Sequence, residues 1–406
     1  MDVQDQLVYL RTTAAIREQC QRILAQGEKG LLPHFTYHPE QLSAVIDFVL
    51  RHIRDNYPNL DIPYHSRWRH FDARRLALLE QKLEGGAPEG KARSKVELAI
   101  VSVLLDAGAG MGWRYTDRWG VSSRMSEGLA AASFDMFLEG AFSSDPKQPL
   151  RVDAKGLKQL DTQTLAQAFQ VTESNPLQGF SGRLALLHKL GEALESEPSI
   201  FGDREPRLGH IFDAIVASAS PQRAVAAPEI LSTVLLGLGS IWPGRITLGG
   251  QNLGDVWPHR ALPKDDKGAG LVPFHKLSQW LSYSLAEPCE EAGYTITHLD
   301  QLTGLAEYRN GGLLLDLGLL SLRDPSGGER SHKPDSELIV EWRALTVSLL
   351  DRIAEGVRHA LGKSALELPL AKVLQGGTWS AGRKIAAQKR SDGGPPLRLD
   401  SDGTVF

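Results

Sequence analysis

Asp106 stands in sequence surroundings that favour chemistry. It follows an apolar run and precedes three alternating glycines within residues 104–115. Glycine lets the backbone approach a ligand closely, and a carboxylate at the end of a buried helix can have its pKa tuned by its surroundings. A helix-terminating glycine accounts for one of these glycines, but not for Asp106 together with all three. The pattern also differs from a dinucleotide-binding fingerprint, because no strand precedes it and the glycine spacing is different.

Glu307 is the second acidic residue in unusual surroundings. Apolar residues dominate positions 302–306, and Tyr308 and Arg309 follow directly. A carboxylate in apolar surroundings, with a phenol and a guanidinium beside it, suits the stabilisation of an oxocarbenium ion. The alternative is a surface glutamate paired with an arginine, an arrangement that contributes little to stability. The residue pattern leaves both interpretations open.

A third segment, residues 62–71, combines two histidines, two arginines and three aromatic residues. Its titratable members are His65, Arg67, Arg69 and His70. Arginine donates hydrogen bonds in a fixed fork and aromatic rings stack on planar groups, so the mixture suits an anion or sugar site. The alternative is a solvated turn whose aromatic residues are anchored in the core.

Two further segments have both a functional and a structural interpretation. In residues 122–128, Ser122 or Ser123 is predicted to cap a helix rather than to act in catalysis. In residues 376–383, a Thr378 cap would open a helix whose Trp379 and Arg383 close a pocket. The alternative for this second segment is a docked C-terminal tail with Trp379 buried as a core residue.

Helical periodicity dominates the elements that must position these residues. It predicts helices over residues 6–26, 39–55, 95–106, 123–139, 181–196, 204–216, 228–238, 274–291, 335–361 and 379–389. Residues 245–248 are the best strand candidate, as one arm of a short hairpin. Loops rich in Gly, Pro, Ser or charge are predicted at 83–94, 142–150, 171–179, 261–270 and 323–334. The expected fold is mainly α, multi-helical and two-lobed, with lobes 1–145 and 146–406 that could also form one continuous domain.

Composition restricts the class of ligand and of cellular location. The formal net charge is -4, which disfavours a nucleic-acid polymer as partner and favours a small molecule. Two cysteines, Cys20 and Cys289, fit a reducing compartment and offer no metal-ligand spacing. The N-terminal residues lack an apolar signal region, and the longest apolar stretches, 99–105 and 313–320, are too short to span a membrane. We therefore expect a soluble cytoplasmic protein with no metal or organic cofactor and no membrane partner, and the sequence leaves the oligomeric state open.

Six stretches resemble a family first described as a domain of unknown function and linked to uracil catabolism in fungi and bacteria. They are residues 10–17, 62–71, 105–110, 126–130, 302–318 and 377–383. Because these stretches span nearly the whole chain, the similarity is not a local coincidence.

The chain is also similar, more distantly, to the queuosine-nucleotide glycosylases. That family carries an Asp, six residues and then an aromatic residue, as Asp106 and Trp113 do here. Its Phe-Tyr-Lys-Arg-Ala-Gln segment corresponds to residues 274–279, and its Leu-Thr-x-Phe-Ala-Asp-Tyr-Arg motif to residues 302–309. This resemblance implies a helical fold like that of the DNA glycosylases. In that family the acid of the second motif lies beside the scissile N-glycosidic bond, which implies the same place for Glu307.

Three departures from the glycosylase pattern bear on the ligand. Glu307 is one methylene longer than the family's Asp, Ser284 replaces an Asp, and Leu305 replaces the Phe that flanks the base. Losing that ring weakens base stacking. The departures argue against a large deazapurine and for a smaller leaving group.

Together the resemblances imply a particular reaction. A uracil pathway that opens the pyrimidine ring while it is still attached to ribose would leave a ribosylurea. The implied activity is hydrolysis of N-ribosylurea, or of its phosphate, to ribose or ribose phosphate and urea. Glu307 would stabilise the oxocarbenium ion or attack C1, and Asp106, or instead Lys276, would protonate the leaving urea.

The remaining site residues are expected to bind substrate. Leu305, Tyr308, Arg309, Trp379 and Arg383 would shape the sugar pocket, and His65, Arg67, Arg69 and His70 would hold polar groups or a 5′-phosphate. The competing hypothesis is a non-catalytic binding or scaffold protein of the same pathway, for which the uncharged Ser284 is the best support. A third hypothesis, hydrolysis of a ureido amide bond, lacks a recognisable Ser-His-Asp or Cys-Lys arrangement.

Overall fold

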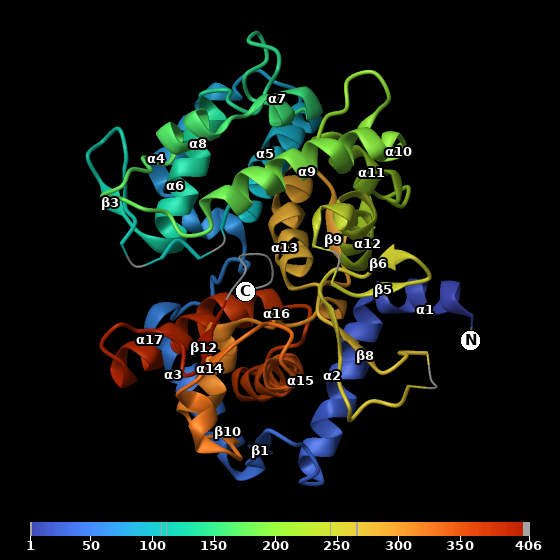
Figure 1. The fold of residues 1–406 in the computed structure, drawn as a ribbon, viewed down its shortest axis with the longest axis vertical. Helices are drawn as coiled ribbons and strands as arrows, with labels where there is room; N and C mark the ends of the chain where they lie inside the picture. Colours follow the sequence, from blue (N-terminus) through green and yellow to red (C-terminus); the bar gives the residue numbers. More distant parts are fainter. Residues whose placement is uncertain (1, 107, 111, 244, 265–266, 401–406) are drawn as a thin grey trace. The chain divides into compact units, whose positions relative to one another are not determined.

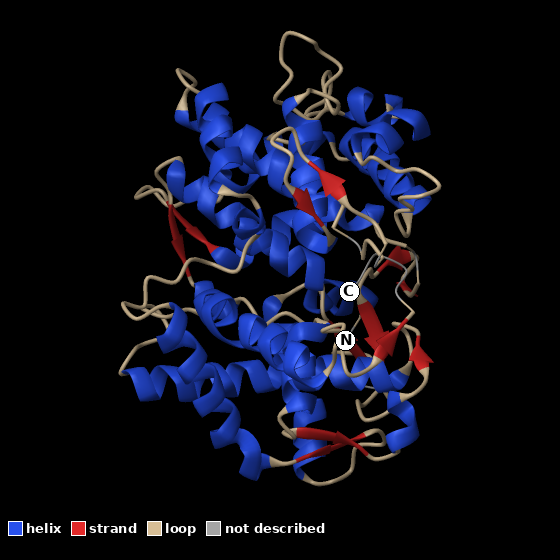
Figure 2. Cartoon of the chain, turned by 90° about the vertical axis from the view of Figure 1, so that its left-hand side faces the viewer, coloured by secondary structure: helices blue, strands red, loops and turns tan. Residues whose placement is uncertain are grey.

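The computed structural model describes residues 2–106, 108–110, 112–243, 245–264, 267–400. Within them the fold is mainly α, as the helical periodicity predicted, and the strands are short and paired in twos. Figure 2 shows this balance, with helices in blue and the few strands in red. No described helix combines the length and the apolar character that crossing a membrane requires.

The chain forms two compact units that are each discontinuous in sequence. Unit 1 comprises Met1–His65, Gly244–Gln279 and His298–Phe406, and unit 2 comprises Ser66–Pro243 and Trp280–Thr297. Residues 145 and 146, where the sequence suggested a boundary between lobes, both lie within unit 2. The division also runs through residues 62–71, so His65 belongs to unit 1 and Arg67, Arg69 and His70 belong to unit 2.

Unit 1 is built around one long buried helix. Its α-helices are α1 (Val3–Leu10), α2 (Thr13–Glu28), α3 (Leu42–Asn56), α14 (Tyr308–Asp316), α15 (Glu337–Leu361), α16 (Leu370–Val373) and α17 (Trp379–Lys389). Helix α15 packs against α2, α3 and α14, and α14 packs against α17 (Figure 1). Residues 339–350 of α15 are buried on every side, which is typical of a core helix.

Short elements complete unit 1. Its strands are β1 (Phe35–Tyr37), β5 (Thr247–Leu248), β6 (Gln251–Asn252), β7 (Val256–Pro258), β8 (Leu271–Pro273), β10 (Leu320–Leu322), β11 (Ser331–His332) and β12 (Arg398–Leu399). β1 pairs antiparallel with β10, β5 with β6 and β7 with β8, whereas β11 and β12 pair in parallel. Three 3-10 turns are η1 (Pro39–Gln41), η4 (Leu299–Gln301) and η5 (Pro325–Gly328), and η6 (Leu374–Thr378) is a π-helix.

Unit 2 is also helical. Its α-helices are α4 (Ala73–Lys82), α5 (Pro88–Leu104), α6 (Met125–Leu138), α7 (Ala154–Gln159), α8 (Thr162–Ala168), α9 (Phe180–Ser196), α10 (Pro198–Phe201), α11 (His210–Ala217) and α12 (Ala227–Leu238). Strands β2 (Tyr115–Thr116) and β3 (Ser122–Ser123) form a hairpin, and β4 (Ala224–Ala226) pairs in parallel with β9 (Thr295–Thr297). The 3-10 turns are η2 (Arg67–His70) and η3 (Gly239–Ile241). Helix α13 (Lys276–Glu291) begins in unit 1 and continues in unit 2.

Several predictions from periodicity need correction. The single helix predicted over residues 6–26 is two helices, because the first ends at Leu10 with Arg11 as its C-cap, and Thr12 caps the second by accepting the backbone N–H of Ala15. The predicted loop 83–94 instead contains the start of α5, where Pro88 occupies a favourable first-turn position. Residues 204–209 precede α11 instead of opening it. The predicted hairpin arm at 245–248 is confirmed, with β5 and β6 as its two strands.

The two predicted serine and threonine caps are wrong. Ser122 and Ser123 form strand β3, and α6 has Arg124 at its N-cap with no side-chain capping bond. Thr378 is the last residue of the π-helix, and the chain continues without a break into α17, so no side-chain cap forms there either.

Candidate active site

Glu307 is held rigidly at the start of α14. It is the N-cap residue, and its carboxylate accepts the backbone N–H groups of Arg309 at 2.7 Å and of Asn310 at 2.6 Å. The side chain is buried, with the residue only 6% exposed. Both oxygens are thus oriented by the first turn of a helix, whose dipole also favours a negative charge there. The alternative of a solvated surface glutamate is excluded by this burial.

Close helix packing fixes the position of this first turn. Gly382 on α17 lies against the carbonyl of Arg309, where a Cβ atom would sit only 2.3 Å from that oxygen. A Cβ atom on Gly311 would sit 2.7 Å from the indole of Trp342 on α15, whose Nε1 donates to the Gly311 carbonyl at 3.1 Å. Glycine at these two positions lets α15 and α17 clamp α14, and therefore Glu307, from two sides.

The electrostatic surroundings of Glu307 oppose its ionisation only in part. Burial raises the pKa of its carboxyl above the ordinary value, and the positive charge of Lys276 is the strongest influence in the opposite direction. Lys276 also lowers the pKa of His65, so one ammonium group lies near both residues. A carboxylate destabilised by burial and partly compensated by a cation is typical of functional sites.

His65 is a buried, uncharged residue of unit 1 near Lys276. Burial lowers the pKa of its imidazole to about 4, so it is uncharged at neutral pH. Its Nδ1 lies 2.9 Å from Oε1 of Gln375, and its ring packs on Trp379 with centroids 5.0 Å apart. Because the Gln375 oxygen can only accept, Nδ1 carries the proton of the neutral ring. Gln375 belongs to the π-helix η6, a type of distortion that frequently occurs at functional sites.

Asp255 connects the backbone elements that carry Lys276 and Glu307. Its carboxylate accepts the backbone N–H of Lys276 at 3.0 Å and two bonds from the Arg343 guanidinium, at 2.7 and 2.8 Å. Burial opposes its ionisation, but Arg343 and these hydrogen bonds lower the pKa of Asp255 to about 2. Arg343 Nε also donates to the carbonyl of Ala306 at 3.1 Å, directly before Glu307.

Among the buried polar side chains of unit 1 that have atoms without a hydrogen-bond partner in the described residues, three lie near the candidate site. Both amide atoms of Gln279 and of Asn310, and the hydroxyl of Thr378, are in this state, and all three residues are 0% exposed. Gln279 lies one helical turn after Lys276, and Asn310 lies in the same turn as Glu307. Buried polar groups are nearly always hydrogen-bonded, so these atoms require an explanation such as a bound ligand or water.

The other unit 1 residues predicted to bind substrate also have defined positions. Leu305 is buried, Arg309 lies over the ring of Tyr308 with 4.9 Å from Cζ to the centroid, and Arg383 lies over the ring of Trp379 at 5.1 Å. Arg309 additionally donates to the carbonyl of Gly393 at 2.6 Å, which ties the C-terminal segment to α14. The charge of Lys276 thus acts on both His65 and Glu307. Arg309 and Arg383 each lie over an aromatic ring.

In unit 2, Asp106 and Arg67 form a buried ion pair at the end of α5. Arg67 Nη1 lies 2.5 Å from Oδ2 of Asp106, which also accepts the hydroxyl of Ser126. Arg67 Nε donates to Ser102 at 2.7 Å, and its backbone N–H donates to Ser284 at 2.9 Å. The Arg67 side chain is fully buried and that of Asp106 is 10% exposed. The Asp106 carboxylate thus accepts hydrogen bonds from two side-chain donors.

Arg67 also lies between aromatic rings. Its Cζ is 5.8 Å from the ring centroids of both Phe71 and Trp280. Burial lowers the pKa of the guanidinium, and Asp106 counteracts that effect. Its Nη2 is buried with no hydrogen-bond partner among the described residues.

Arg69 and His70 differ from Arg67 in their surroundings. Arg69 Nη2 donates to Glu287 at 2.6 Å, and the two side chains are 28% and 20% exposed. The ring of His70 contacts Trp280 edge-on, with centroids 5.6 Å apart. The charge of Arg69 is thus already compensated by a carboxylate of its own unit.

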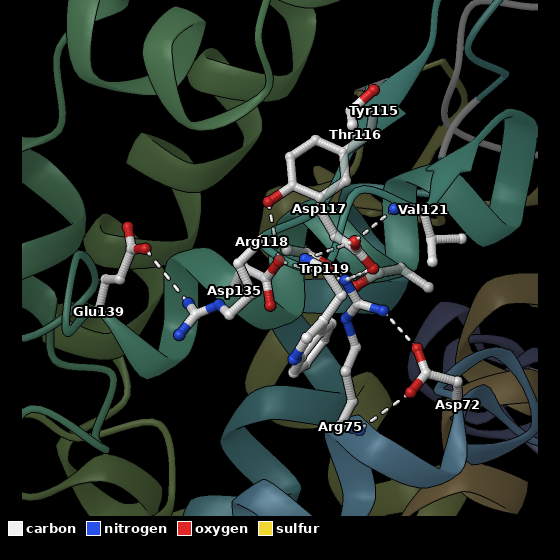
Figure 3. A network of polar contacts seen from close by, with 12 residues as sticks. Asp72, Arg75, Tyr115, Thr116, Asp117, Arg118, Trp119, Val121, Asp135 and Glu139 are labelled. Atoms are coloured by element: carbon white, nitrogen blue, oxygen red, sulfur yellow. Dashed lines mark hydrogen bonds and ion pairs between the residues drawn. The ribbon is translucent and has the colours of Figure 1, made fainter.

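A network of acidic residues around Arg75 fixes the hairpin that precedes Ser126 (Figure 3). Arg75 Nη2 contacts Asp117 at 3.1 Å and Asp135 at 3.2 Å, and Tyr115 donates to Asp135 at 2.8 Å. Asp117 also accepts the backbone N–H of Val121 at 2.8 Å, which closes the turn between β2 and β3. This network holds the start of α6, and with it the Ser126 hydroxyl that binds Asp106.

Each of the two regions contains a residue with a left-handed backbone conformation. His275, directly before Lys276, has φ 47°, and Met125, directly before Ser126, has φ 50°. Such conformations cost energy in residues other than glycine and cluster at functional sites.

Sequence reasoning missed several residues of these clusters. Asp255, Arg343 and Gln375 are distant in sequence from the motifs, and nothing in their local patterns indicated a role. Asn310 lies within the matching stretch 302–318. The sequence does not indicate that its amide is buried, so it predicted no role for this residue. Within the described residues, no group of three or more His, Cys, Asp or Glu side chains could hold a metal ion, and Cys20 and Cys289 are buried free thiols.

Comparisons with known proteins agree with the uracil-related resemblance. The family model described as "Protein of unknown function (DUF1688)" matches residues 9–406. Among curated proteins, "Uracil catabolism protein 4" of Lachancea kluyveri is 37% identical over 446 residues, covering 100% of both chains. "Protein urg3" of Schizosaccharomyces pombe is 40% identical over 402 residues, covering 96% of each chain. The similarity therefore extends over both units.

Proposed function

Since the chain belongs to the DUF1688 family of proteins of unknown function, in which a full-length relative is called a uracil catabolism protein, we propose that it acts in uracil catabolism. More specifically, we propose that it hydrolyses the N-glycosidic bond of a ribosylurea-type compound. The observation that carries this proposal is the buried Glu307 carboxylate, oriented by two backbone N–H groups and accompanied by Lys276. The earlier resemblance to queuosine-nucleotide glycosylases supports the same role for this residue.

Glu307 is suited to the sugar side of the reaction. Cleavage of the bond between C1 and the urea nitrogen leaves positive charge on C1 and the ring oxygen. A fixed carboxylate stabilises that charge, or forms a bond to C1 that water then hydrolyses. In both cases the hydroxyl from water ends on C1 and a proton ends on urea, so the products are ribose and urea.

Lys276 is the better proton donor of the two candidates raised by the sequence. Its positive charge lowers the pKa of Glu307, so its ammonium lies near that carboxylate, and an ammonium group has protons to donate. Asp106 accepts hydrogen bonds from Arg67 and Ser126, and donors of this kind favour the charged carboxylate, which has no proton to give. We therefore assign leaving-group protonation to Lys276, and to Asp106 the structural role of compensating the Arg67 charge.

The unsatisfied amides of Gln279 and Asn310 fit the chemistry of the leaving group. Each offers one donor and one acceptor that have no partner among the described residues. Urea presents donors and an acceptor in the same plane, so a carboxamide can satisfy both at once. A site built to bind such polar atoms discriminates strongly against analogues that lack them.

The direct test is to incubate the purified protein with N-ribosylurea and with its 5′-phosphate, and to measure urea and reducing sugar. We expect stoichiometric release of urea and ribose, or ribose phosphate, from one of the two substrates. Glu307→Gln serves as the negative control. Tight binding of either compound without release would instead support the competing hypothesis of a non-catalytic binding protein.

A further inference from the structure

A separate cavity of unit 1 lies beside the strands that precede Lys276. It has a volume of about 610 Å³, within the range of small-molecule sites. Its lining residues come from four segments of the chain: Arg245, Ile246, Trp257, Pro258, Lys333, Pro334, Asp335 and Asp400. None of these residues belongs to the motifs or to the site proposed for glycoside hydrolysis.

The lining combines three kinds of recognition group. The Arg245 guanidinium lies over the indole of Trp257, with 5.3 Å from Cζ to the ring centroid, which makes a flat platform. Lys333 is an exposed cation, and Asp335 and Asp400 are exposed carboxylates. The pairing of β11 with β12, extended by the bond from the Asp400 N–H to the His332 carbonyl at 2.9 Å, brings Asp400 to the Lys333 segment.

Each group has a counterpart in one class of ligand. Guanidinium planes stack on nucleobases, a lysine ammonium binds phosphate, and carboxylates accept hydrogen bonds from ribose hydroxyls. We propose that this cavity binds a ribonucleoside 5′-monophosphate, with the base on Arg245, the phosphate on Lys333 and the ribose hydroxyls on Asp335 and Asp400.

The cavity wall is connected by hydrogen bonds to the elements that carry Lys276 and Glu307. Trp257 Nε1 donates to Asp255 Oδ1 at 2.6 Å. Asp255 in turn accepts the backbone N–H of Lys276 and holds Arg343, which donates to the carbonyl before Glu307. A ligand that orders Trp257 therefore also orders the first turn of α13. Any effect of this ligand on turnover rests on the proposed function. The binding of the ligand and the ordering of α13 do not depend on that function.

Binding is tested with the full-length protein by isothermal titration calorimetry, using UMP, AMP, dUMP, uridine and ribose 5-phosphate. We expect saturable binding of UMP or AMP that Lys333→Ala weakens at least 10-fold, with no change for uridine. Lys29→Ala, which removes another exposed lysine of unit 1, is the matched control. The double variant Asp335→Asn, Asp400→Asn should erase the preference for UMP over dUMP.

Two results would overturn the binding proposal: no saturable binding of any nucleotide, or equal weakening by Lys333→Ala and Lys29→Ala. A nucleotide bound at the hydrolytic site is recognised separately, because its affinity falls in Glu307→Gln and not in Lys333→Ala. None of these measurements needs catalytic turnover. They therefore stand even if the proposed hydrolysis fails.

The connection to Lys276 is tested by hydrogen exchange of the backbone amides at residues 276–279. We expect bound UMP to slow their exchange in the wild-type protein. Trp257→Phe keeps an aromatic platform but removes the donor to Asp255, so UMP should still bind without slowing this exchange. Trp119→Phe, in unit 2, is the control for loss of an indole. Unchanged exchange in the wild-type protein with UMP bound would disprove the connection.

Discussion

Glu307 and Asp106 are both partly or fully buried carboxylates in segments rich in glycine, but their surroundings are opposite. Glu307 is held by backbone N–H groups, and burial raises the pKa of its carboxyl. Asp106 is held by side-chain donors and forms a buried ion pair with Arg67. Burial thus makes the negative charge of Glu307 unfavourable, whereas Arg67 compensates the negative charge of Asp106.

This difference separates a reactive group from a structural one. A costly charge whose hydrogen bonds come from rigid backbone N–H groups is held in place to interact with a developing cation. A paired charge mainly protects its partner: without Asp106, the fully buried Arg67 guanidinium would lose its counter-charge. The predictions below test this division, beginning with the largest effect.

Glu307→Gln is expected to reduce kcat for ribosylurea hydrolysis by about 100–1,000-fold, since it removes the negative charge from the reacting centre. The fold should persist, as measured by circular dichroism and thermal unfolding. Glu341→Gln is the matched control: Glu341 is also buried and also accepts backbone N–H groups, from His34 and Phe35, but it lies outside the proposed site. Loss of activity in both variants with similar loss of stability would contradict a specific role for Glu307.

Lys276→Met is expected to lower kcat on ribosylurea by about 100-fold, the lower end for a lost general acid. A substrate whose leaving group needs no proton, such as a ribosyl nitrophenyl ether, should lose much less. Equal losses on both substrates would assign Lys276 to positioning.

The same variant should also change the pH profile. Glu307 must be ionised, so activity falls as pH drops through its pKa, which burial raises, and the acid limb of kcat/KM lies above the ordinary range of a glutamate carboxyl. Lys276 lowers the pKa of Glu307, so removing it raises that pKa further and moves the acid limb to higher pH. His65, whose pKa is about 4, contributes nothing to the profile near neutrality. A shift toward lower pH would contradict the electrostatic assignment.

Asp106→Asn is expected to act on stability first. It weakens a charge-assisted hydrogen bond to a buried cation, at a cost of about 1.5–3 kcal/mol in the free energy of unfolding. The double variant Arg67→Met, Asp106→Asn should be less destabilised than the two single variants added together, because the uncompensated cation is gone. Loss of turnover in Asp106→Asn without loss of stability would show that Asp106 acts on the substrate.

The sequence predicted the fold class and most long helices because their apolar periodicity is strong. Helices such as α9, α12 and α15 begin and end within two residues of their predicted limits. The break at Arg11 and Thr12 was missed because two polar residues there interrupt the apolar pattern without changing its period. Strands such as β1 and β10 pair across almost the whole chain, and no local pattern contains that information.

The site was predictable where residues share a motif and unpredictable where folding brings them together. Glu307, Lys276 and Asp106 each stand in a recognisable local pattern. Asp255 and Arg343 act through contacts between distant segments, so only the structure shows them. Residues 62–71 were treated as one basic turn, although the chain passes from one compact unit to the other within them.

Arg69 provides the smallest expected effect. The density of cations in residues 62–71 predicted that Arg69 binds a 5′-phosphate, so that Arg69→Ala would raise KM for a phosphorylated substrate by about 10-fold. In the structure its guanidinium is paired with Glu287, and both side chains are partly exposed to solvent. Exposed pairs of this kind contribute about 0–1 kcal/mol, so we now expect a change of less than about 5-fold in KM.

Arg69→Ala and the double variant Arg69→Ala, Glu287→Gln should be compared on the phosphorylated and unphosphorylated substrates. Similar small changes on both would assign the pair to structure. A rise confined to the phosphorylated substrate, 10-fold or more, would show that Arg69 leaves Glu287 to bind phosphate, and that the difference between compensated and available charge can be reversed by a ligand.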